Sequence, residues 1–393
     1  MKARPLIDAR ALQPGYKEHA QRGLGRYAKS LFTAMFQQVE PGELSFILRR
    51  DLPQPELPDP SPRLAVGSGP QSLPGGERLI GQFYTLPRAL APAWQQGRVV
   101  HFLSHADAPA RLGPRTVLTC QDLIFQRMEE IYIEGRNPQV FHAARWLETR
   151  CLSRAARILA ISECTKRDLV ELYRIPPERI SVAPLAVDPG LAPVEDPATR
   201  GEVLARYGLA EREYFFYLGG IDPRKDLPTL LRALLILREG GGAATLALAG
   251  QVAQDKHYPA LTRLIVELGL SEAVRFLGFV PDADLPALYS GAAAFAFPSL
   301  YEGFGLPPLE AMACGAPVAA VAAAAVPEVV EDAGLLVPPG DAQALARALD
   351  ALRGDPELAA RYRALGLKRA AGFSWERTAS QTLKVYEEVA AAA

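Results

Sequence analysis

Two glutamates, Glu302 and Glu310, flank a Gly-Phe-Gly segment in the second half of the chain. The apolar run before them, residues 292–298, is typical of a buried strand. The two prolines after the glycines suit the first turn of a helix, where a missing N–H group costs little. Gly315 suits the end of that helix. The segment therefore predicts a strand, a glycine-lined loop and a short helix whose first N–H groups bind an anion, with phosphate the expected one.

Two carboxylates beside a phosphate site present a conflict, because like charges repel. The conflict disappears if Glu302 and Glu310 accept hydrogen bonds from hydroxyl groups instead. A nucleotide sugar carries a diphosphate in its middle and sugar hydroxyls at both ends. The hypothesis is therefore a nucleotide-sugar site, whereas either glutamate taken alone would be interpreted as a solvated surface residue.

A second segment, residues 214–234, ends an apolar run in Gly219 and Gly220 and then presents Arg224 and Lys225 before a helical pattern. A guanidinium binds phosphate through two parallel hydrogen bonds, and an ammonium acts as a point charge. At the carboxyl end of a strand these two groups are suited to neutralising a diphosphate leaving group. On its own, an Arg-Lys pair in a loop would be solvated.

The sequence YEGFGLPPLEAMACG resembles the E-x7-E signature of the retaining GT-B glycosyltransferases, family 4 (group 1) in particular. The resemblance implies that Glu310 holds the ribose hydroxyls and that Glu302 holds the donor sugar and stabilises oxocarbenium-like charge. It also implies that Arg224, Lys225 and the loop amides stabilise the departing diphosphate. The loop residues concerned are Gly303, Phe304, Gly305 and Leu306. The family usually has an arginine directly after the glycine pair, where this chain has Ile221.

The resemblance extends to other segments. It implies donor contacts at Gly220 and at the backbone of Val280, the latter beside the nucleotide base. In the first half, residues 21–35 resemble the family's glycine loop, with Gly23 and Gly25 near the donor phosphates. The same glycines match the dinucleotide pattern G-x-G-x-x-A, but a long segment separates them from the preceding strand, so an oxidoreductase is not favoured.

Three residues near strand ends complete the expected site. Related enzymes commonly have His-Asp where this chain has Gln121 and Asp122, so Asp122 is a catalytic candidate, while Gln121 can hydrogen-bond but cannot take up a proton. His105 follows another strand and is a candidate for the acceptor pocket, the alternative being an ordinary loop histidine.

Short β-rich runs alternate with helical patterns along the chain, which predicts parallel sheets with helices on both faces. The predicted strands are PLIDA, LSFILR, VVHFLS, TVLTC, ARILAIS and ISVAPLAV, followed by YFFYLGG, TLALAG, VRFLGFV, AAAFAFP, PVAAV and GLLVP. Residues 51–80, rich in Pro, Gly and Ser, are predicted as a long loop.

The fold class is therefore α/β, and the resemblance implies the GT-B architecture, two doubly wound Rossmann-like domains facing a central cleft. We expect an acceptor-side domain over residues 1–187, a proline-rich linker over 188–198 and a nucleotide-sugar domain over 199–374. The last helix, residues 375–393, is expected to pack back on the first domain.

Composition narrows the function classes further. The net charge is −1, but residues 1–187 are basic and the remainder is acidic. The density of basic residues is too low for a nucleic-acid binder. The basic helix with Arg145, Arg150, Arg154 and Arg157 is either a membrane contact or a solvated face. The four cysteines and five histidines lack metal-ligand spacing, so no metal and no other cofactor is expected.

Without a signal peptide or a long apolar run, we expect a cytoplasmic enzyme, with peripheral association at the inner membrane face as a further hypothesis. The predicted function is retaining, metal-independent transfer of a hexose from a GDP- or UDP-linked donor to a hydroxyl of a glycan or lipid-linked glycan, as in polysaccharide biosynthesis. One alternative is a sucrose- or trehalose-type synthase that uses a small sugar or sugar phosphate. An alternative of another class is a non-catalytic GT-B binding subunit.

Overall fold

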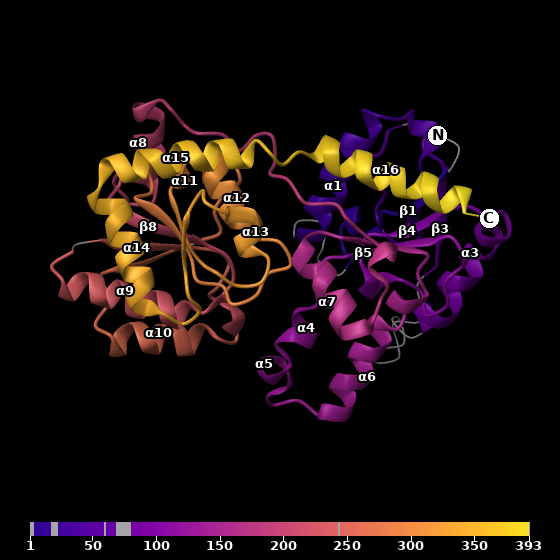
Figure 1. Ribbon diagram of the computed structural model, residues 1–393, viewed down its shortest axis with the longest axis horizontal. Helices are drawn as coiled ribbons and strands as arrows, with labels where there is room; N and C mark the ends of the chain where they lie inside the picture. Colours follow the sequence, from indigo (N-terminus) through magenta and orange to yellow (C-terminus); the bar gives the residue numbers. More distant parts are fainter. Residues whose placement is uncertain (1–3, 17–22, 59, 68–79, 243, 393) are drawn as a thin grey trace. The chain divides into compact units, whose positions relative to one another are not determined.

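The computed structural model describes residues 4–16, 23–58, 60–67, 80–242 and 244–392 of the 393-residue chain (Figure 1). The chain divides into two compact units. Unit 1 comprises Met1–Leu185 and Ser374–Ala393, and unit 2 comprises Ala186–Phe373. Each unit is built around one parallel sheet with helices on its faces.

Unit 1 contains a seven-stranded parallel sheet in the order β3-β2-β1-β4-β5-β6-β7. Its strands are β1 Leu6–Asp8, β2 Ser45–Arg49, β3 Arg63–Val66, β4 Val100–Phe102, β5 Thr116–Cys120, β6 Arg157–Ala160 and β7 Ile180–Val182. Its helices are α1 Gly23–Phe36, α3 Leu86–Gln95, α4 Ile124–Arg127, α5 Glu129–Ile133, α6 Pro138–Thr149, α7 Glu163–Tyr173 and α16 Trp375–Ala391. Short helical turns are η1 Arg10–Leu12, η2 Pro41–Glu43, η3 Gly81–Thr85, η4 His105–Asp107, η5 Leu152–Arg154 and η6 Pro177–Arg179.

Unit 2 contains a six-stranded parallel sheet in the order β10-β9-β8-β11-β12-β13. Its strands are β8 Tyr214–Leu218, β9 Thr245–Ala249, β10 Val274–Gly278, β11 Ala294–Phe297, β12 Val318–Val321 and β13 Leu335–Val337. Its helices are α8 Pro197–Arg206, α9 Leu227–Glu239, α10 Tyr258–Glu267, α11 Leu285–Gly291, α12 Leu306–Ala313, α13 Val326–Val330, α14 Ala342–Gly354 and α15 Pro356–Ala370, with the turn η7 Pro223–Lys225.

The strand order decides where ligands can bind in each unit. In both sheets the order reverses beside the first strand, at β1 and β4 in unit 1 and at β8 and β11 in unit 2. In doubly wound sheets the crevice outside the carboxyl ends of such a pair of strands is the usual ligand site. The central strands are buried on both faces, as the continuous apolar runs of their sequences predict.

The predicted long loop over residues 51–80 is wrong in part. Residues 63–66 form the edge strand β3, paired in parallel with β2, inside the segment predicted as a long loop. Three of the four residues of β3 are exposed or half-buried, so the segment lacks the apolar run that identifies a buried strand. Residues 59 and 68–79 of that segment lie outside the described residues.

Helix α16 belongs to unit 1 although it follows unit 2 in the sequence, and it packs against α1 (Figure 1). The rings of Tyr27 and Trp375 lie 5.9 Å apart. The fully buried His101 on β4 is 2.6 Å from the hydroxyl of Tyr386 through Nδ1 and 2.8 Å from Oγ1 of Thr119 through Nε2. A buried polar network therefore fixes the position of the last helix on the sheet.

Burial lowers the pKa of His101 to about 3. The unfolded chain therefore binds a proton near pH 6.5 that the folded chain does not bind, and the unfolding free energy falls as the pH falls from about 6.5 toward 3. We expect His101→Asn to reduce the loss of stability between pH 7 and pH 5 by about 2 kcal/mol. Urea unfolding at the two pH values measures this. His142→Asn, at an exposed histidine, is the matched control and should keep the wild-type slope; an unchanged slope in His101→Asn would contradict the prediction.

Candidate active site

Two loops of unit 2 meet at the carboxyl ends of β8 and β11, where the strand order reverses. The backbone carbonyl of Arg224, in the loop after β8, accepts hydrogen bonds from Leu300 N at 2.8 Å and from Ser299 Oγ at 3.3 Å. Both donors lie in the loop after β11. The two segments that the sequence predicts as parts of one site are therefore joined by direct contacts.

Glu302 lies at the centre of this junction. Its Oε1 accepts hydrogen bonds from Arg224 Nη1 at 2.7 Å, from Lys225 Nζ at 2.6 Å and from Ser299 Oγ at 2.6 Å. Arg224 Nη1 also donates to the carbonyl of Tyr301 at 3.0 Å. Oε1 thus receives three hydrogen bonds, and among the described residues none donates to Oε2.

The charges of this cluster stabilise one another. The side chain of Glu302 is only 13% exposed, and burial alone would raise its pKa, but the neighbouring Lys225 and Arg224 hold that pKa below its usual range. Glu302 is therefore a carboxylate at neutral pH. Lys225 Nζ also lies 5.3 Å from the ring centre of Phe297, so its cation faces the negative side of an aromatic ring.

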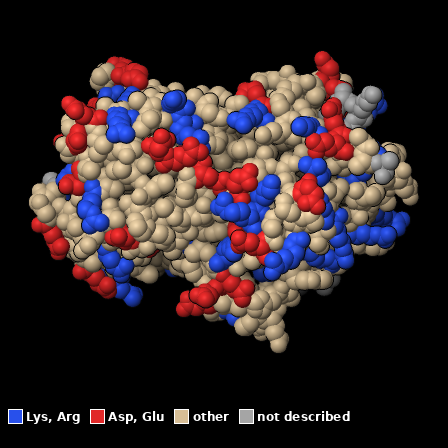
Figure 2. Space-filling model, viewed as in Figure 1, with Lys and Arg blue, Asp and Glu red and all other residues tan. Residues whose placement is uncertain are grey.

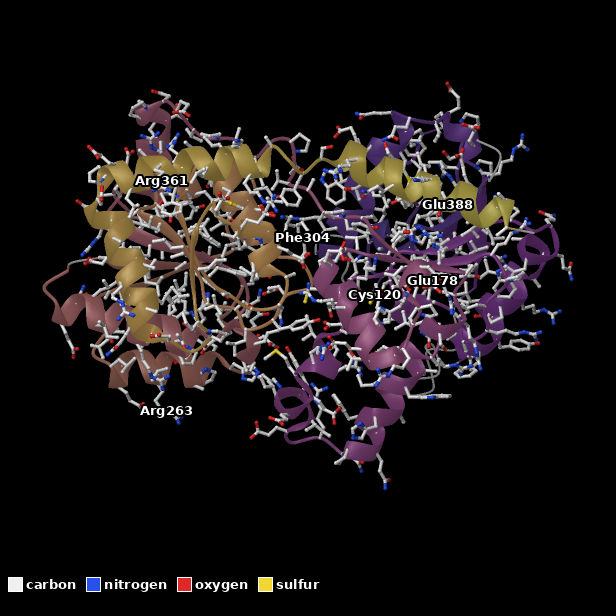
Figure 3. The ribbon with its side chains drawn as sticks, viewed as in Figure 1. Cys120, Glu178, Arg263, Phe304, Arg361 and Glu388 are labelled. Atoms are coloured by element: carbon white, nitrogen blue, oxygen red, sulfur yellow. The ribbon has the colours of Figure 1, made fainter. Side chains whose placement is uncertain are left out.

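The loop between Glu302 and α12 presents unpaired backbone donors. Among the described residues, none accepts a hydrogen bond from the N–H groups of Phe304, Gly305 or Leu306. Phe304, labelled in Figure 3, is 5% exposed, and Gly305 is buried with φ 114°, a backbone angle that favours glycine. Unpaired buried N–H groups are rare, so consecutive ones indicate a site for an anion.

The structure refines which groups supply that anion site. Pro307 and Pro308 occupy the second and third positions of α12 and have no N–H to donate. The donors are therefore the loop amides and Leu306 at the first helical position, while the helix dipole still contributes positive potential. Gly315, with φ 73°, follows the end of α12 as predicted.

Glu310 lies one turn into α12 and is 6% exposed. Its Oε2 accepts a hydrogen bond from the hydroxyl of Tyr289 on α11 at 3.0 Å. A buried carboxylate needs hydrogen-bond donors, and Tyr289 provides one that fixes the side chain. The two glutamates of the motif therefore differ: Glu302 lies among cations, and Glu310 contacts a neutral hydroxyl.

Glycines let the strand ends of this sheet approach closely. A Cβ on Gly250 would lie 2.3 Å from the carbonyl oxygen of Gly219, so only glycine fits after β9. The carbonyl of Gly220, on the exposed side of the same loop, accepts a hydrogen bond from Tyr217 Oη at 2.6 Å. Val280, predicted beside the base, is 6% exposed, whereas the preceding Phe279 is 66% exposed.

The remaining predicted residues belong to unit 1. Gly23 and Gly25 lie inside the first turns of α1, Gly23 exposed and Gly25 buried, and not in a loop before the helix as predicted. The preceding Gln21 and Arg22 lie outside the described residues. Because a 3.6-residue periodicity begins at the glycines, the helix incorporates them despite their low helix propensity.

Gln121, Asp122 and His105 lie at the carboxyl ends of β5 and β4, which are neighbours in the sheet. Gln121 Nε2 donates to the carbonyl of Leu103 at 3.1 Å, and Asp122 Oδ1 accepts from Ile124 N at 3.2 Å. Burial lowers the pKa of His105 to about 4, so this histidine is neutral at pH 7, and its buried Nδ1 has no hydrogen-bond partner among the described residues.

Ser299 and Tyr289 are the two contributors that the sequence did not predict. Ser299 lies two residues after the end of the buried strand β11, so its position near the strand end was available as a signal. Tyr289 is in the helix before that strand, and only the packing of α11 against α12 brings it to Glu310. Within the described ranges, no group of three His, Cys, Asp or Glu residues is arranged to hold a metal ion.

In each of the two parallel sheets the strand order reverses beside the first strand, as in a doubly wound Rossmann-like fold. The protein therefore consists of two Rossmann-like units. Residues 203–369 match the family model described as Glycosyl transferases group 1, and residues 23–191 match Glycosyltransferase Family 4. The chain is 35% identical to O-antigen chain mannosyltransferase B of Escherichia coli over 320 residues, which are 79% of this chain and 80% of the relative. The chain therefore belongs to the group 1, family 4 glycosyltransferases.

Further similarities bear on length and fold. The chain is 34% identical over 287 residues to the serotype-specific mannosyltransferase WbdA of Escherichia coli, which is 71% of this chain but only 35% of WbdA. Sucrose-phosphate synthase from Thermosynechococcus elongatus has a TM-score of 0.76 at 22% identity over 99% of both chains. Anabaena HepE in complex with UDP and glucose has a TM-score of 0.69 at 20% identity over 97% of this chain and 98% of that one. These likenesses show the GT-B fold.

Within the part of the chain that the structure describes, no helix has both the length and the apolar character that a bilayer crossing requires.

Proposed function

We propose that this glycosyltransferase transfers a hexose from a nucleoside-diphosphate sugar to an acceptor hydroxyl with retention of the anomeric configuration. The observation that carries the proposal is the arrangement at the β8–β11 edge. Arg224 and Lys225 meet on Oε1 of Glu302, and the unpaired amides of Phe304, Gly305 and Leu306 follow directly in the chain. Cations and N–H donors suit a diphosphate, and a carboxylate with a free oxygen suits a sugar hydroxyl.

In this proposal each group has a separate role. Arg224, Lys225 and the loop amides stabilise the negative charge that develops on the departing diphosphate. Glu302 accepts a hydrogen bond from the donor sugar through Oε2 and stabilises its oxocarbenium-like charge. Glu310 binds the ribose hydroxyls. None of these side chains is placed as a covalent nucleophile, so the acceptor attacks from the face that the diphosphate leaves, and a phosphate oxygen takes the proton.

The relatives guide the choice of donor and acceptor. One relative is named as an O-antigen chain mannosyltransferase, and HepE is described in complex with UDP and glucose. We therefore propose a GDP- or UDP-linked hexose and a glycan or lipid-linked glycan acceptor. A small sugar or sugar phosphate remains the alternative acceptor, and turnover with a soluble sugar alone would favour it.

The first experiment is a screen of GDP- and UDP-linked hexoses for thermal stabilisation. A ligand present at 100 times its dissociation constant should raise the unfolding free energy by about 2.7 kcal/mol. The free nucleoside is the control for contacts to the base and ribose alone. If no nucleotide sugar stabilises the protein and none is turned over, the chain is a non-catalytic binding subunit.

We expect catalysis to retain the donor configuration and to proceed without a divalent metal. Arg224, Lys225 and the start of α12 already supply positive potential for a diphosphate. Product NMR reports the anomeric configuration, and an assay in excess EDTA reports the metal requirement. An inverted product would contradict the proposal and would make Asp122 and His105 candidates for a general base.

Peripheral membrane contact is a further part of the proposal. The predicted basic helix is wrong beyond Thr149, where α6 ends: Arg154 lies in the turn η5 and Arg157 begins β6. Arg145 pairs with Glu148, and Arg157 pairs with Glu388. Arg150 instead lies over the exposed rings of Phe83, at 4.8 Å, and Trp146, at 5.0 Å. Aromatic and basic side chains together suit an anionic membrane interface.

We expect anionic vesicles at low salt to bind the protein and to shift its tryptophan emission to shorter wavelength, with Trp146→Phe abolishing most of the shift. Trp375, which is 8% exposed, is the reference because its environment should not change. Vesicle sedimentation measures the binding itself. No sedimentation at low salt would remove membrane contact from the proposal.

A further inference from the structure

Arginines gather at the amino edge of the unit 1 sheet, opposite to the edge where His105 and Gln121 lie. Arg4 and Arg98 each precede a strand by two residues, Arg115 directly precedes β5, and Arg157 is the first residue of β6. The four strands concerned, β1, β4, β5 and β6, are consecutive in the sheet. Because neighbouring strands lie about 4.8 Å apart, the sheet places these four arginines side by side.

Hydrogen bonds to main-chain carbonyls hold two of the guanidinium groups. Arg98 donates to the carbonyl of Arg4 at 3.1 Å and to Oγ of Ser45 at 2.8 Å. Arg115 donates to the carbonyl of Gly97 at 2.8 Å. The positions of these cations are therefore set by the backbone and not by carboxylates.

The positive charge at this edge is only partly compensated. Among the described residues, none forms an ion pair with Arg4, Arg98 or Arg115, and Arg157 pairs with Glu388 at 2.8 Å. Burial lowers the pKa of Arg98, and the like charge of Arg4 lowers it further. Of the residues that the structure describes, the one other carboxylate that lines the groove belongs to the exposed Glu387.

The arginines line two adjoining pockets. A pocket of about 1190 Å³ is bounded by Arg4, Arg98 and Arg115 together with Glu387 and the last turn of α16. A second hollow of about 530 Å³ shares Arg115 with it and extends to Arg157 and Glu388. Glu388, labelled in Figure 3, marks the end of α16 at this edge. Figure 2 shows basic side chains interspersed with acidic ones on the visible face of unit 1.

We infer that this arginine groove, defined by Arg4, Arg98, Arg115 and Arg157, binds a phosphate-bearing ligand at a site separate from the one proposed for the nucleotide sugar. Guanidinium groups recognise phosphate oxygens through paired hydrogen bonds, and several of them on adjacent strands can contact one diphosphate. A bound anion would also relieve the repulsion between Arg4 and Arg98. A pocket of about 1190 Å³ is large enough for a compact phosphate-bearing ligand.

Calorimetric titration with inorganic pyrophosphate at low salt tests the inference. The wild-type protein should bind pyrophosphate at two sites. Arg98→Ala with Arg115→Ala should weaken one of them by about 100-fold or more and leave the other unchanged. Arg224→Ala with Lys225→Ala should remove the other one. Arg136→Ala with Arg167→Ala, which removes the same charge from exposed positions of unit 1, should leave both.

The variant Arg98→Gln with Arg115→Gln is the control for misfolding of the alanine variant, because its neutral amides can keep hydrogen bonds to the carbonyls while the charge is lost. It should reproduce the alanine result. Sedimentation with phosphatidic acid vesicles distinguishes a free phosphate from a lipid headgroup. If the wild type binds the vesicles, the glutamine variant does not, and pyrophosphate does not bind in the groove, the ligand is a lipid headgroup. If the glutamine variant binds both pyrophosphate and vesicles like the wild type, the inference is wrong, whatever the outcome at Arg224 and Lys225.

Discussion

Replacing Glu302 by Gln should lower turnover by roughly 100-fold or more while nucleoside diphosphate binding is retained. A group that faces charge developing in the transition state typically contributes about 2.7 to 4 kcal/mol. The neutral amide cannot stabilise a positive sugar in this way. Because Arg224 and Lys225 lose their shared carboxylate, their charge becomes fully available to phosphate, so the diphosphate should bind at least as tightly as to the wild type.

Steady-state kinetics with the native donor and acceptor, together with calorimetric titration of the nucleoside diphosphate, measure the two effects. The unliganded variant should also be less stable, because removing one partner of a buried ion pair typically costs about 3 to 5 kcal/mol. Unfolding is therefore measured with and without nucleotide. Asp350→Asn, which removes an exposed carboxylate paired with Arg353, is the control. Near-native turnover in Glu302→Gln would show that the assigned role is wrong.

Replacing Arg224 and Lys225 together by alanine should weaken nucleoside diphosphate binding by about 100-fold or more and leave the free nucleoside almost unaffected. Each hydrogen bond to a charged group contributes about 1.5 to 3 kcal/mol, and both lost contacts would be to phosphate. Glu302 would remain behind as an isolated carboxylate near the phosphates, which adds repulsion. Calorimetry with the nucleoside, the monophosphate and the diphosphate separates the contributions.

The matched control is Arg238→Ala with Arg347→Ala, two exposed arginines of unit 2. This variant loses the same charge without touching the β8–β11 edge, so it reports any effect of net charge on anion binding. Equal weakening of nucleoside and diphosphate in the Arg224 and Lys225 variant would indicate a damaged fold or a base-proximal position for these residues.

Local patterns were sufficient to predict most of the fold. Strands such as β8 and β11 are continuous apolar runs because parallel strands are covered on both faces, and every predicted strand is present. The missed strand, β3, is a sheet edge whose side chains are largely exposed, and neither its composition nor its periodicity separates it from a loop.

The site was predictable as a set of residues but not as a geometry. Glu302, Arg224 and Lys225 are identified by motif and by their place after strands. That both cations donate to the same oxygen of Glu302 depends on how two loops far apart in the sequence fold together. The contact between Tyr289 and Glu310 likewise arises from helix packing. The unpaired amides of the loop follow from its backbone conformation. Residue types indicate that conformation only at the glycines.

The placement of α16 affects the order in which the two units can fold during synthesis. Unit 2 is complete once Phe373 has been synthesised, whereas unit 1, which begins first, still lacks the helix that supplies Tyr386 to the buried His101. During translation unit 1 therefore cannot complete its fold until α16 has been made, and part of its apolar surface stays uncovered while unit 2 can already fold. A chain that stops before Ser374 would carry all of unit 2 but only part of unit 1, so the folding of unit 1 depends on the synthesis of α16.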